Sequence, residues 1–261
     1  MNTLETCLGI SGSFEGGNGG PCWGNVAGDF DGMTLSVGAL QQNIGTGSIQ
    51  ELLSITKSNF GGTPPPEFSE VFGLLGLDAA PARAYAFAKG WLNTAKNGSP
   101  LTLQAATYWK ALLTTHQCIA AQTSLAQRIL DKAVIDARAY VGFFGMQDNL
   151  RALAFFFDVR VQQGGMARGT RRVESYSSVQ QADPSRAIQL AKDGNHKQTE
   201  AAWTSIVPTD DLASVLLSYA YDRASLGRPE YLWDCTSRRG TIACRKGGVH
   251  GKMFDFSTEL P

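Results

Sequence analysis

The chain has 261 residues, of which 43% are hydrophobic and 18% charged, as expected for a globular protein with a substantial core. Lys and Arg together number 23, and so do Asp and Glu, so the formal net charge is zero. A neutral chain disfavours nucleic-acid binding that depends on phosphate neutralisation. No window is apolar enough for a membrane span, and the first residues lack the basic and apolar regions of a signal peptide.

The N-terminal segment combines a helix with a short hairpin. Residues 2–14 are predicted to be helical, with Asn2 or Thr3 as the cap and an apolar face. The glycines and the proline of residues 16–21 end this helix. β-branched and alternating residues in 34–43 then indicate a short strand or hairpin.

The remaining sequence is mainly helical. We expect Ser48 to cap a second helix and 61–66 to form a loop. Segment 162–183 is predicted to be a loop or mobile flap, and 237–261 is compatible with a hairpin. Periodic apolar residues predict further helices over 82–92, 103–121, 125–144, 149–161, 184–192, 200–206 and 210–224.

These elements predict a predominantly helical α+β protein. We expect a single domain over residues 1–261, in which 1–60 supply the catalytic helix and β-hairpin and 61–261 supply a large helical lobe and the C-terminal tail. A cleft between a hairpin and a helical lobe suits a polymeric substrate.

Three polar residues near the N-terminus have the types and the order that glycosidic-bond cleavage needs. That reaction uses one protonated carboxyl to donate to the leaving oxygen and one ionised carboxyl to attack or to activate water. Glu15 suits the acid, because Phe14 can desolvate its carboxyl. Asp29 suits the base, since its glycine-flanked turn keeps it ionised. The Thr34 hydroxyl can hold the attacking water.

Each of these residues also has an ordinary structural interpretation. Glu15 can be a solvated surface charge, and Thr34 can be a strand residue. Asp29 and Asp31 can satisfy a turn, or form half of a calcium loop whose other ligands are missing. Glu5, which lies ten residues before Glu15 on a similar helix face, is a rival for the acid.

Residues 8–53 resemble the catalytic region of the lysozyme superfamily, which includes phage-type lysozymes, chitosanases and goose-type lysozymes with lytic transglycosylases. Gly28-Asp29-Phe30-Asp31-Gly32-Met33-Thr34 is similar to the chitosanase pattern Gly-Asp-Gly-Arg-Gly-Tyr-Thr. Gly38-Ala39-Leu40-Gln41 resembles the Gly-Leu-Met-Gln element of transglycosylases and goose-type lysozymes. The segment 156–165 is loosely similar to a chitosanase segment that ends in His-Gly.

The resemblance implies a lysozyme-like fold with Glu15 as the acid, Asp29 as the base and Thr34 as the residue that positions water. It also implies that the strand containing Gln41 lines the sugar-binding cleft. From their residue types, further substrate contacts are expected at Trp23, Asp31, Gln42 and Asn43; hairpin packing is the alternative role for Trp23. No metal or cofactor is expected.

The chain departs from the chitosanase pattern at three points. Glu15 and Asp29 are only 14 residues apart, Asp31 replaces the arginine, and Gln163 replaces the histidine. We therefore expect a muramidase that cleaves the β-1,4 bond between N-acetylmuramic acid and N-acetylglucosamine. The alternatives are a chitosanase-type hydrolase, a lytic transglycosylase and a non-catalytic wall-binding module.

A wall hydrolase without a signal peptide is typically a phage lysin or an injected antibacterial toxin. We therefore expect secretion or injection and activity in the bacterial periplasm or cell wall, on peptidoglycan glycan strands. An injected toxin would also have an immunity protein that plugs the cleft.

The cysteines and basic residues leave two questions open. Cys7 with Cys22 and Cys235 with Cys244 are candidate pairs, which would suit an oxidising compartment; reduced, partly buried thiols are the alternative. The three histidines are far apart and form no recognisable ligand cluster. Two basic groups are either contacts for an anionic polymer or solvated faces: Arg168, Arg171 and Arg172, and Arg238, Arg239, Arg245 and Lys246.

Overall fold

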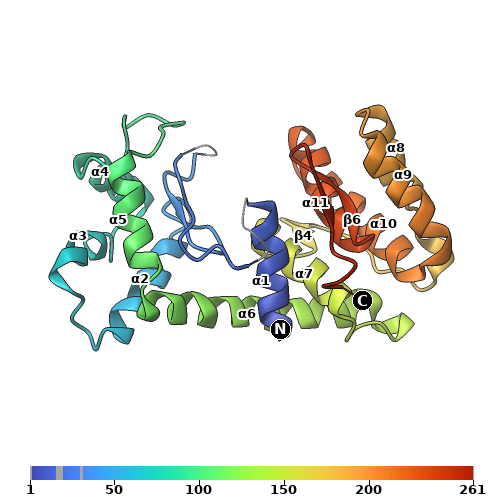
Figure 1. Cartoon of the computed structure of the whole chain (residues 1–261), viewed down its shortest axis with the longest axis horizontal. Helices are drawn as coiled ribbons and strands as arrows, with labels where there is room; N and C mark the ends of the chain where they lie inside the picture. Colours follow the sequence, from blue (N-terminus) through green and yellow to red (C-terminus); the bar gives the residue numbers. More distant parts are fainter. Residues whose placement is uncertain (1, 16–19, 30–31, 261) are drawn as a thin grey trace. The chain divides into compact units, whose positions relative to one another are not determined.

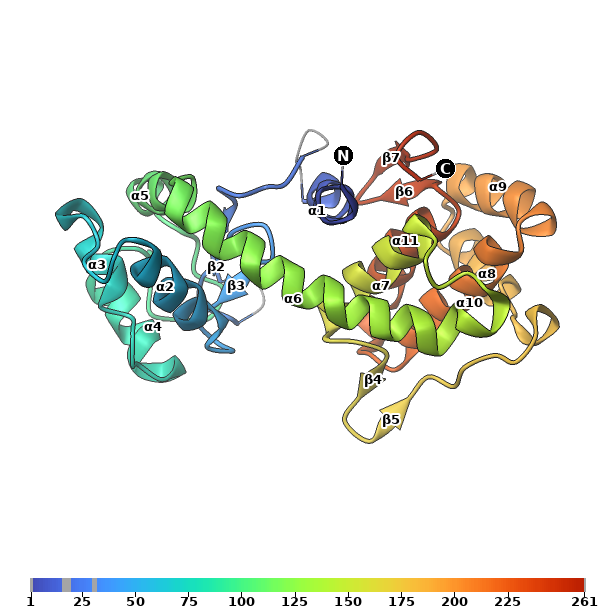
Figure 2. The ribbon, with the colours of Figure 1, turned by 90° about the horizontal axis from the view of Figure 1, so that it is seen from below.

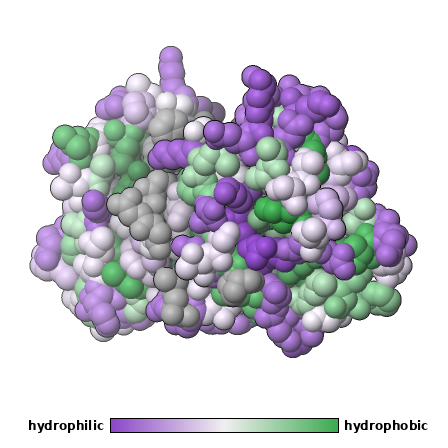
Figure 3. All heavy atoms as spheres, turned by 45° about the vertical axis from the view of Figure 1, so that its right-hand side comes forward, coloured by the Kyte–Doolittle hydropathy of each residue, from purple (hydrophilic) through white to green (hydrophobic). Residues whose placement is uncertain are grey.

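The computed structural model describes residues 2–15, 20–29 and 32–260 (Figure 1). Within these ranges α-helices predominate, and the strands are short and antiparallel. This confirms the prediction of a mostly helical α+β protein. On the face shown in Figure 3, hydrophilic side chains are dense and hydrophobic ones occur in separate groups.

The chain folds into two compact units. Unit 1 comprises Met1–Gly20 and Arg128–Pro261, and unit 2 comprises Pro21–Gln127. The 26-residue helix α6, His116–Val141, contributes to both units and is the long green helix in Figure 2. Residue 60 is not a boundary between the units, because the helix Ser48–Asn59 packs on the helix Ser69–Phe72 that follows it. The single catalytic domain remains a prediction.

Unit 1 begins with the predicted helix α1, Thr3–Phe14. Asn2 Oδ1 accepts the Glu5 N–H at 2.9 Å, and Glu5 Oε2 accepts the Asn2 N–H at 3.1 Å. This reciprocal capping box pairs donors that a helix start otherwise leaves unsatisfied. Glu5 therefore has a structural role as part of the cap. The buried face of α1 includes Leu4, Cys7, Leu8, Ile10 and Phe14.

The core of unit 1 is built from α7, Leu150–Gln163, α10, Asp211–Ser225, and α11, Leu232–Ala243. These helices pack against one another, and α7 also packs on α1. Phe155, Phe156 and Phe157 are fully buried, which confirms that the predicted helix over 149–161 is central. Further helices of this unit are α8 (Ser185–Asp193), α9 (Lys197–Ile206) and the short η2 (Gly142–Phe144), η4 (Val207–Thr209) and η5 (Pro229–Tyr231).

Segment 162–183, predicted as a loop or flap, contains regular elements as well. The strands β4, Ala167–Arg168, and β5, Arg171–Arg172, form a hairpin, and η3, Val179–Gln181, follows. The Arg168 and Arg171 guanidinium groups both donate to the Leu226 carbonyl at 3.2 Å. The exposed basic hairpin is thus tied to the end of α10.

The C-terminal region differs from its prediction. A hairpin is present, with β6, Lys246–Val249, pairing with β7, Lys252–Asp255. It is preceded by α11, however, which the sequence interpretation missed. Arg238 and Arg239 lie on α11 and are 2% and 0% exposed. Their prediction as polymer contacts or a solvated face is therefore wrong, because both guanidinium groups pair inside the core.

Unit 2 contains a three-stranded antiparallel sheet formed by β1, Val26–Ala27, β2, Ser36–Val37, and β3, Gln42–Asn43. The pair β2–β3 confirms the predicted hairpin within 34–43. Thr34 itself has a φ of 76°, in the left-handed region, so its interpretation as a strand residue is wrong.

Two helices of unit 2 pack on this sheet in the described part of the chain: Ser48–Asn59 on β3 and Leu103–Leu113 on β1. Ser48 is the first helical residue of α2, and Gly47, with a φ of 76°, is the N-cap; the prediction of Ser48 as the cap is wrong by one residue. The Ser48 hydroxyl instead accepts the Asn43 N–H at 2.8 Å. The helices of unit 2 include α2 (Ser48–Asn59), α3 (Ser69–Phe72) with the preceding η1 (Pro66–Phe68), α4 (Ala79–Ala88), α5 (Leu103–Leu113) and the first part of α6.

Four of the five cysteines are buried thiols outside any disulfide: Cys7, Cys118, Cys235 and Cys244. Cys244 directly follows the last residue of α11 and lies nine residues after Cys235. At about 1.5 Å per residue their Cα atoms are about 13.5 Å apart, beyond disulfide reach, so this predicted pair is wrong. Cys7 is also a buried, unbridged thiol, which excludes the pair with Cys22. Burial raises the pKa of the Cys7 thiol to about 12.

Candidate active site

Glu15, the predicted acid, lies in unit 1 directly after the last residue of α1. Its backbone N–H donates to the Gly12 carbonyl at 3.1 Å, which continues the helical turn. Its side chain is 27% exposed, and Oε1 accepts a hydrogen bond from Arg238 Nη1 at 2.5 Å. Glu15 therefore presents a carboxyl that reaches solvent and is held in place by a cation.

Phe14 anchors the end of α1 beside this carboxyl. Its ring makes edge contacts with Phe254 and Phe256, with centroid distances of 5.1 and 5.6 Å. The Arg238 guanidinium lies 4.8 Å from the Phe14 ring centroid. The predicted desolvation of Glu15 by Phe14 stays a prediction, and the contacts of the ring are with Phe254, Phe256 and the arginine that holds Glu15.

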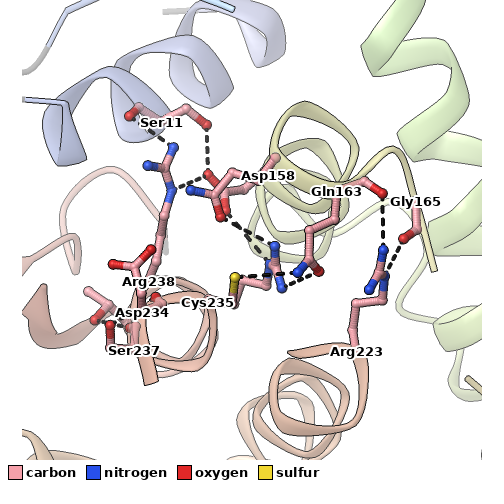
Figure 4. Close-up of polar contacts among 12 residues, drawn as sticks. Ser11, Asp158, Gln163, Gly165, Arg223, Asp234, Cys235, Ser237 and Arg238 are labelled. Carbon is pink, nitrogen blue, oxygen red and sulfur yellow. Dashed lines mark hydrogen bonds and ion pairs between the residues drawn. The ribbon is translucent and has the colours of Figure 1, made fainter. Parts of the chain in front are cut away.

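Arg238 is positioned by a buried carboxylate. Its Nε donates to Asp158 Oδ1 at 2.8 Å, and the same oxygen accepts the Ser11 hydroxyl at 3.2 Å (Figure 4). Arg239 Nε lies 3.9 Å from Asp158 Oδ2, and Arg239 Nη1 donates to Gln163 at 2.9 Å. Glu15, Asp158 and the two arginines thus form a chain of alternating charges with no net charge, which is the condition for burying such groups.

Burial and pairing with carboxylates act in opposite directions on the pKa values of Arg238 and Arg239. Burial lowers the pKa of both guanidinium groups. For Arg238 the carboxylates of Asp158 and Glu15 outweigh burial, so its pKa is raised; the pKa of Arg239 remains lowered.

Sequence reasoning missed Asp158, Arg238 and Arg239 as parts of the site. The signal for Asp158 is its place in an apolar helix, directly after Phe157, where a carboxylate requires a cation. The signal for the arginines is weaker, since α11 itself was not predicted.

Asp29, the predicted base, lies in unit 2, and its side chain is fully buried. Oδ1 accepts the Thr34 N–H at 2.7 Å, and Oδ2 accepts the Gly98 N–H at 3.1 Å and pairs with Arg83 Nη2. The Asp29 N–H donates to the Ser99 carbonyl at 3.0 Å. In this conformation the carboxylate organises the surrounding loops.

Thr34 is also engaged within the protein. It is 3% exposed, and its Oγ1 accepts from Arg83 Nη1 at 3.0 Å. Arg83 Nε donates to the Ala95 carbonyl at 3.1 Å, so one guanidinium joins Asp29, Thr34 and a neighbouring loop. The roles of Asp29 as base and Thr34 as water holder remain predictions. Arg83 gave no sequence signal beyond being a lone cation in an alanine-rich helix.

The motif Gly38-Ala39-Leu40-Gln41 has a structural explanation within unit 2. Gly38 has a φ of 75°, and a Cβ there would lie 2.4 Å from Gln122 Oε1. Gln122 Oε1 accepts the Ala39 N–H at 2.9 Å, while Gln41, with a φ of 52°, closes a turn onto Gly38. These contacts require glycine at position 38.

The other predicted substrate-binding residues are distributed around the same sheet. Trp23 is half-buried before β1, and Gln42 is buried in β3. Asn43 Oδ1 accepts the N–H and the hydroxyl of Thr46, both at 2.9 Å, and so shapes the turn before α2. Asp31 lies outside the described residues. Trp23, Asp29, Thr34, Gln41, Gln42 and Asn43 belong to unit 2, whereas Glu15 belongs to unit 1.

In the residues that the structure describes, no group of three or more His, Cys, Asp or Glu side chains could hold a metal ion. Nor does any described helix have the length and apolar character of a membrane span. No model of a known protein family matches the chain, and a search of curated proteins finds no significant match.

Proposed function

We propose that this chain cleaves the β-1,4 bond between N-acetylmuramic acid and N-acetylglucosamine in peptidoglycan, with Glu15 as the general acid. The supporting observation is the partly exposed Glu15 carboxyl, which the buried pair Arg238–Asp158 holds at the end of α1. A fixed carboxyl that reaches solvent can meet a polymer, and positioning of this kind is a major part of catalysis.

In the cleavage step the Glu15 proton passes to the glycosidic oxygen as the bond from C1 to that oxygen breaks. For hydrolysis, water adds to C1 and gives its proton to a base, for which Asp29 is the candidate, with Thr34 orienting the water. This role requires a carboxyl separation of about 6.5–9.5 Å and predicts inversion at C1. Asp29 would also have to be released from its contacts with Arg83 and Gly98.

A lytic transglycosylase is the second candidate, and the burial of Asp29 favours it. Without an accessible second carboxylate, Glu15 would first protonate the leaving oxygen and then accept a proton from a hydroxyl of the muramic acid itself. That hydroxyl would form a new bond to C1, giving a 1,6-anhydro end instead of a reducing end.

Removing the acid tests the proposal directly. We expect purified chain to release muropeptides from sacculi and Glu15→Gln to lose at least about a hundredfold of the rate, because general acid catalysis contributes about 10²–10⁴-fold. Glu5→Gln is the matched control, since glutamine retains the capping box and no catalytic role is assigned there. Full activity of Glu15→Gln on sacculi would overturn the assignment.

Product analysis by mass spectrometry decides between the candidates. Reducing ends support hydrolysis, and 1,6-anhydro ends support transglycosylation. Asp29→Asn should abolish activity in the first case and lower mainly stability in the second. Activity on chitosan but not on sacculi would indicate a chitosanase, and sacculus binding with no product would indicate a wall-binding module.

The place of action proposed here is the bacterial periplasm or cell wall, reached by secretion or injection, with an immunity protein as a partner if the chain is a toxin. Expression of the chain in a host periplasm should then cause lysis, whereas cytoplasmic expression should not. A chain that is active on sacculi but harmless in the periplasm would contradict the toxin hypothesis.

A further inference from the structure

Unit 1 contains a second concave site that shares no residue with the candidate active site. Its cavity of about 580 Å³ lies between the start of α9, the start of α11 and the turn of the β6–β7 hairpin. A cavity of this size suits a small molecule rather than a single ion. The lining side chains that matter for recognition are His196, Lys197, Trp233, Asp234, His250 and Lys252.

Two contacts between side chains hold the walls of this cavity together. His250 Nε2, in the hairpin turn, lies 2.5 Å from Asp234 Oδ1 on α11. The His196 ring at the start of α9 stacks on Trp233, with a centroid distance of 3.9 Å and an interplanar angle of 5°. Both imidazoles therefore join one structural element to another.

The hairpin is also joined directly to α9. Thr199 Oγ1 accepts the Gly248 N–H at 2.9 Å, and Trp203 Nε1 donates to the Lys246 carbonyl at 3.0 Å. These bonds close the outer edge of β6 and fix its distance from α9. A preformed cavity needs little ordering when a ligand binds, which favours affinity.

The charge of the cavity is positive. In the described part of the chain, neither the Lys197 nor the Lys252 ammonium is in an ion pair. The lining carboxylate, Asp234, already lies against His250. Two unpaired cations over polar walls attract an anion.

We propose that this cavity binds a carboxylate or phosphate group between Lys197 and Lys252, with the uncharged part of the ligand against the stacked His196 and Trp233. The group belongs to a sugar-sized compound or to one unit of an anionic polymer. This proposal does not depend on the proposed catalytic function, because none of its residues takes part in that chemistry.

Binding of three small probes tests the proposal, with isothermal titration and the NMR signals of His196 and His250 as readouts. N-acetylmuramic acid supplies a carboxylate, glycerol phosphate supplies a phosphate, and N-acetylglucosamine is the uncharged sugar control. We expect saturable binding of at least one anion and binding of the neutral sugar weaker by about tenfold or more, which corresponds to the loss of one charge-assisted contact. The preferred anion identifies the source of the ligand.

The double variant Lys197→Gln with Lys252→Gln should weaken anion binding by about tenfold or more. Both side chains are exposed, so the variant should fold, and its melting temperature confirms this. Lys57→Gln with Lys132→Gln removes the same charge elsewhere and should bind like the unmodified chain. Absence of saturable anion binding, equal binding of N-acetylglucosamine, or equal binding by the two double variants would overturn the proposal.

Discussion

Asp158 carries a charge in the interior of unit 1, within a helix whose neighbouring side chains are apolar. An isolated buried carboxylate costs several kcal/mol, and this cost falls when cations and hydrogen-bond donors surround it. Arg238 and Ser11 supply those contacts, and Arg238 in turn holds Glu15. The position of the candidate acid therefore depends on a residue that never needs to touch the substrate.

Substitution of Arg238 should lower stability strongly. Arg238→Gln leaves Asp158 buried without its main cation, and breaking such a pair costs about 3–5 kcal/mol of unfolding free energy. Urea unfolding measures this loss. The exposed Arg228→Gln serves as a control and should change stability by about 0.5 kcal/mol or less. An unchanged urea midpoint for Arg238→Gln would contradict the structural role assigned to the pair.

The sequence could indicate that Asp158 needs a partner, but it could not identify the partner. Arg238 is 80 residues away in the chain, and only the packing of α7 on α11 brings the two together. The same holds for Arg83, which is 54 residues from Asp29. Local sequence patterns carry no information about contacts between residues that are so far apart in the chain.

At the scale of elements, helices with a clear apolar period were found, but the predicted helices 103–121 and 125–144 have the wrong bounds. The chain breaks earlier, since α5 ends at Leu113 and α6 runs without interruption from His116 to Val141. The helix α11 was missed. Its segment contains Thr236, Ser237 and Gly240, which have low helix propensity. The helix forms because it is enclosed by α10, α7 and β6, and this packing outweighs propensity. The strand prediction failed in a similar way at Thr34, which has a left-handed backbone conformation. In this conformation the Thr34 N–H donates to Asp29 and its hydroxyl accepts from Arg83.

Gly240 provides a test of packing against propensity. Alanine favours a helix by about 1 kcal/mol over glycine, but a Cβ at this position would lie 2.4 Å from Trp203 Cζ2 and 2.9 Å from Leu217 Cδ1. Overpacking costs about 1–3 kcal/mol, so we expect Gly240→Ala to destabilise the protein. Thermal unfolding measures the effect, with Gly142→Ala as a control in open space. A higher melting temperature for Gly240→Ala would show that propensity prevails.

At the scale of the whole molecule, unit 1 joins the two ends of the chain around a common core. Arg151 on α7 pairs with both Asp210 oxygens, at 2.6 and 2.8 Å, and also donates to the Ala243 carbonyl at the end of α11. Asp210 caps α10 through the Ala213 N–H at 2.9 Å. One ion pair thus connects three helix ends.

Because Arg151 and Asp210 form this ion pair, we expect the free energy of unfolding to fall in acid. Burial raises the pKa of Asp210, but hydrogen bonds from Arg151 and Ala213 outweigh burial, so the pKa lies below its ordinary value of 3.8. The stabilisation is therefore complete above pH 3.8 and is lost as the pH falls through the lowered value.

Asp210→Asn should accordingly be less stable than the unmodified chain at neutral pH, and the difference should shrink below pH 3.8. Urea unfolding at a series of pH values measures both stabilities. Asp193→Asn, at an exposed position, is the control. A difference that stays constant with pH would contradict the role of the charged carboxylate.

The sequence by itself determined the helical character, the capped first helix, the N-terminal hairpin and the candidate carboxyl Glu15, because capping, periodicity and turn chemistry act over a few residues. Only the tertiary structure decided that Asp29 is buried, that Arg83 and Arg238 hold the two candidate carboxyls, and that a helix separates Cys235 from Cys244. These features depend on which distant segments pack together, and burial of charge is set by that packing rather than by local sequence.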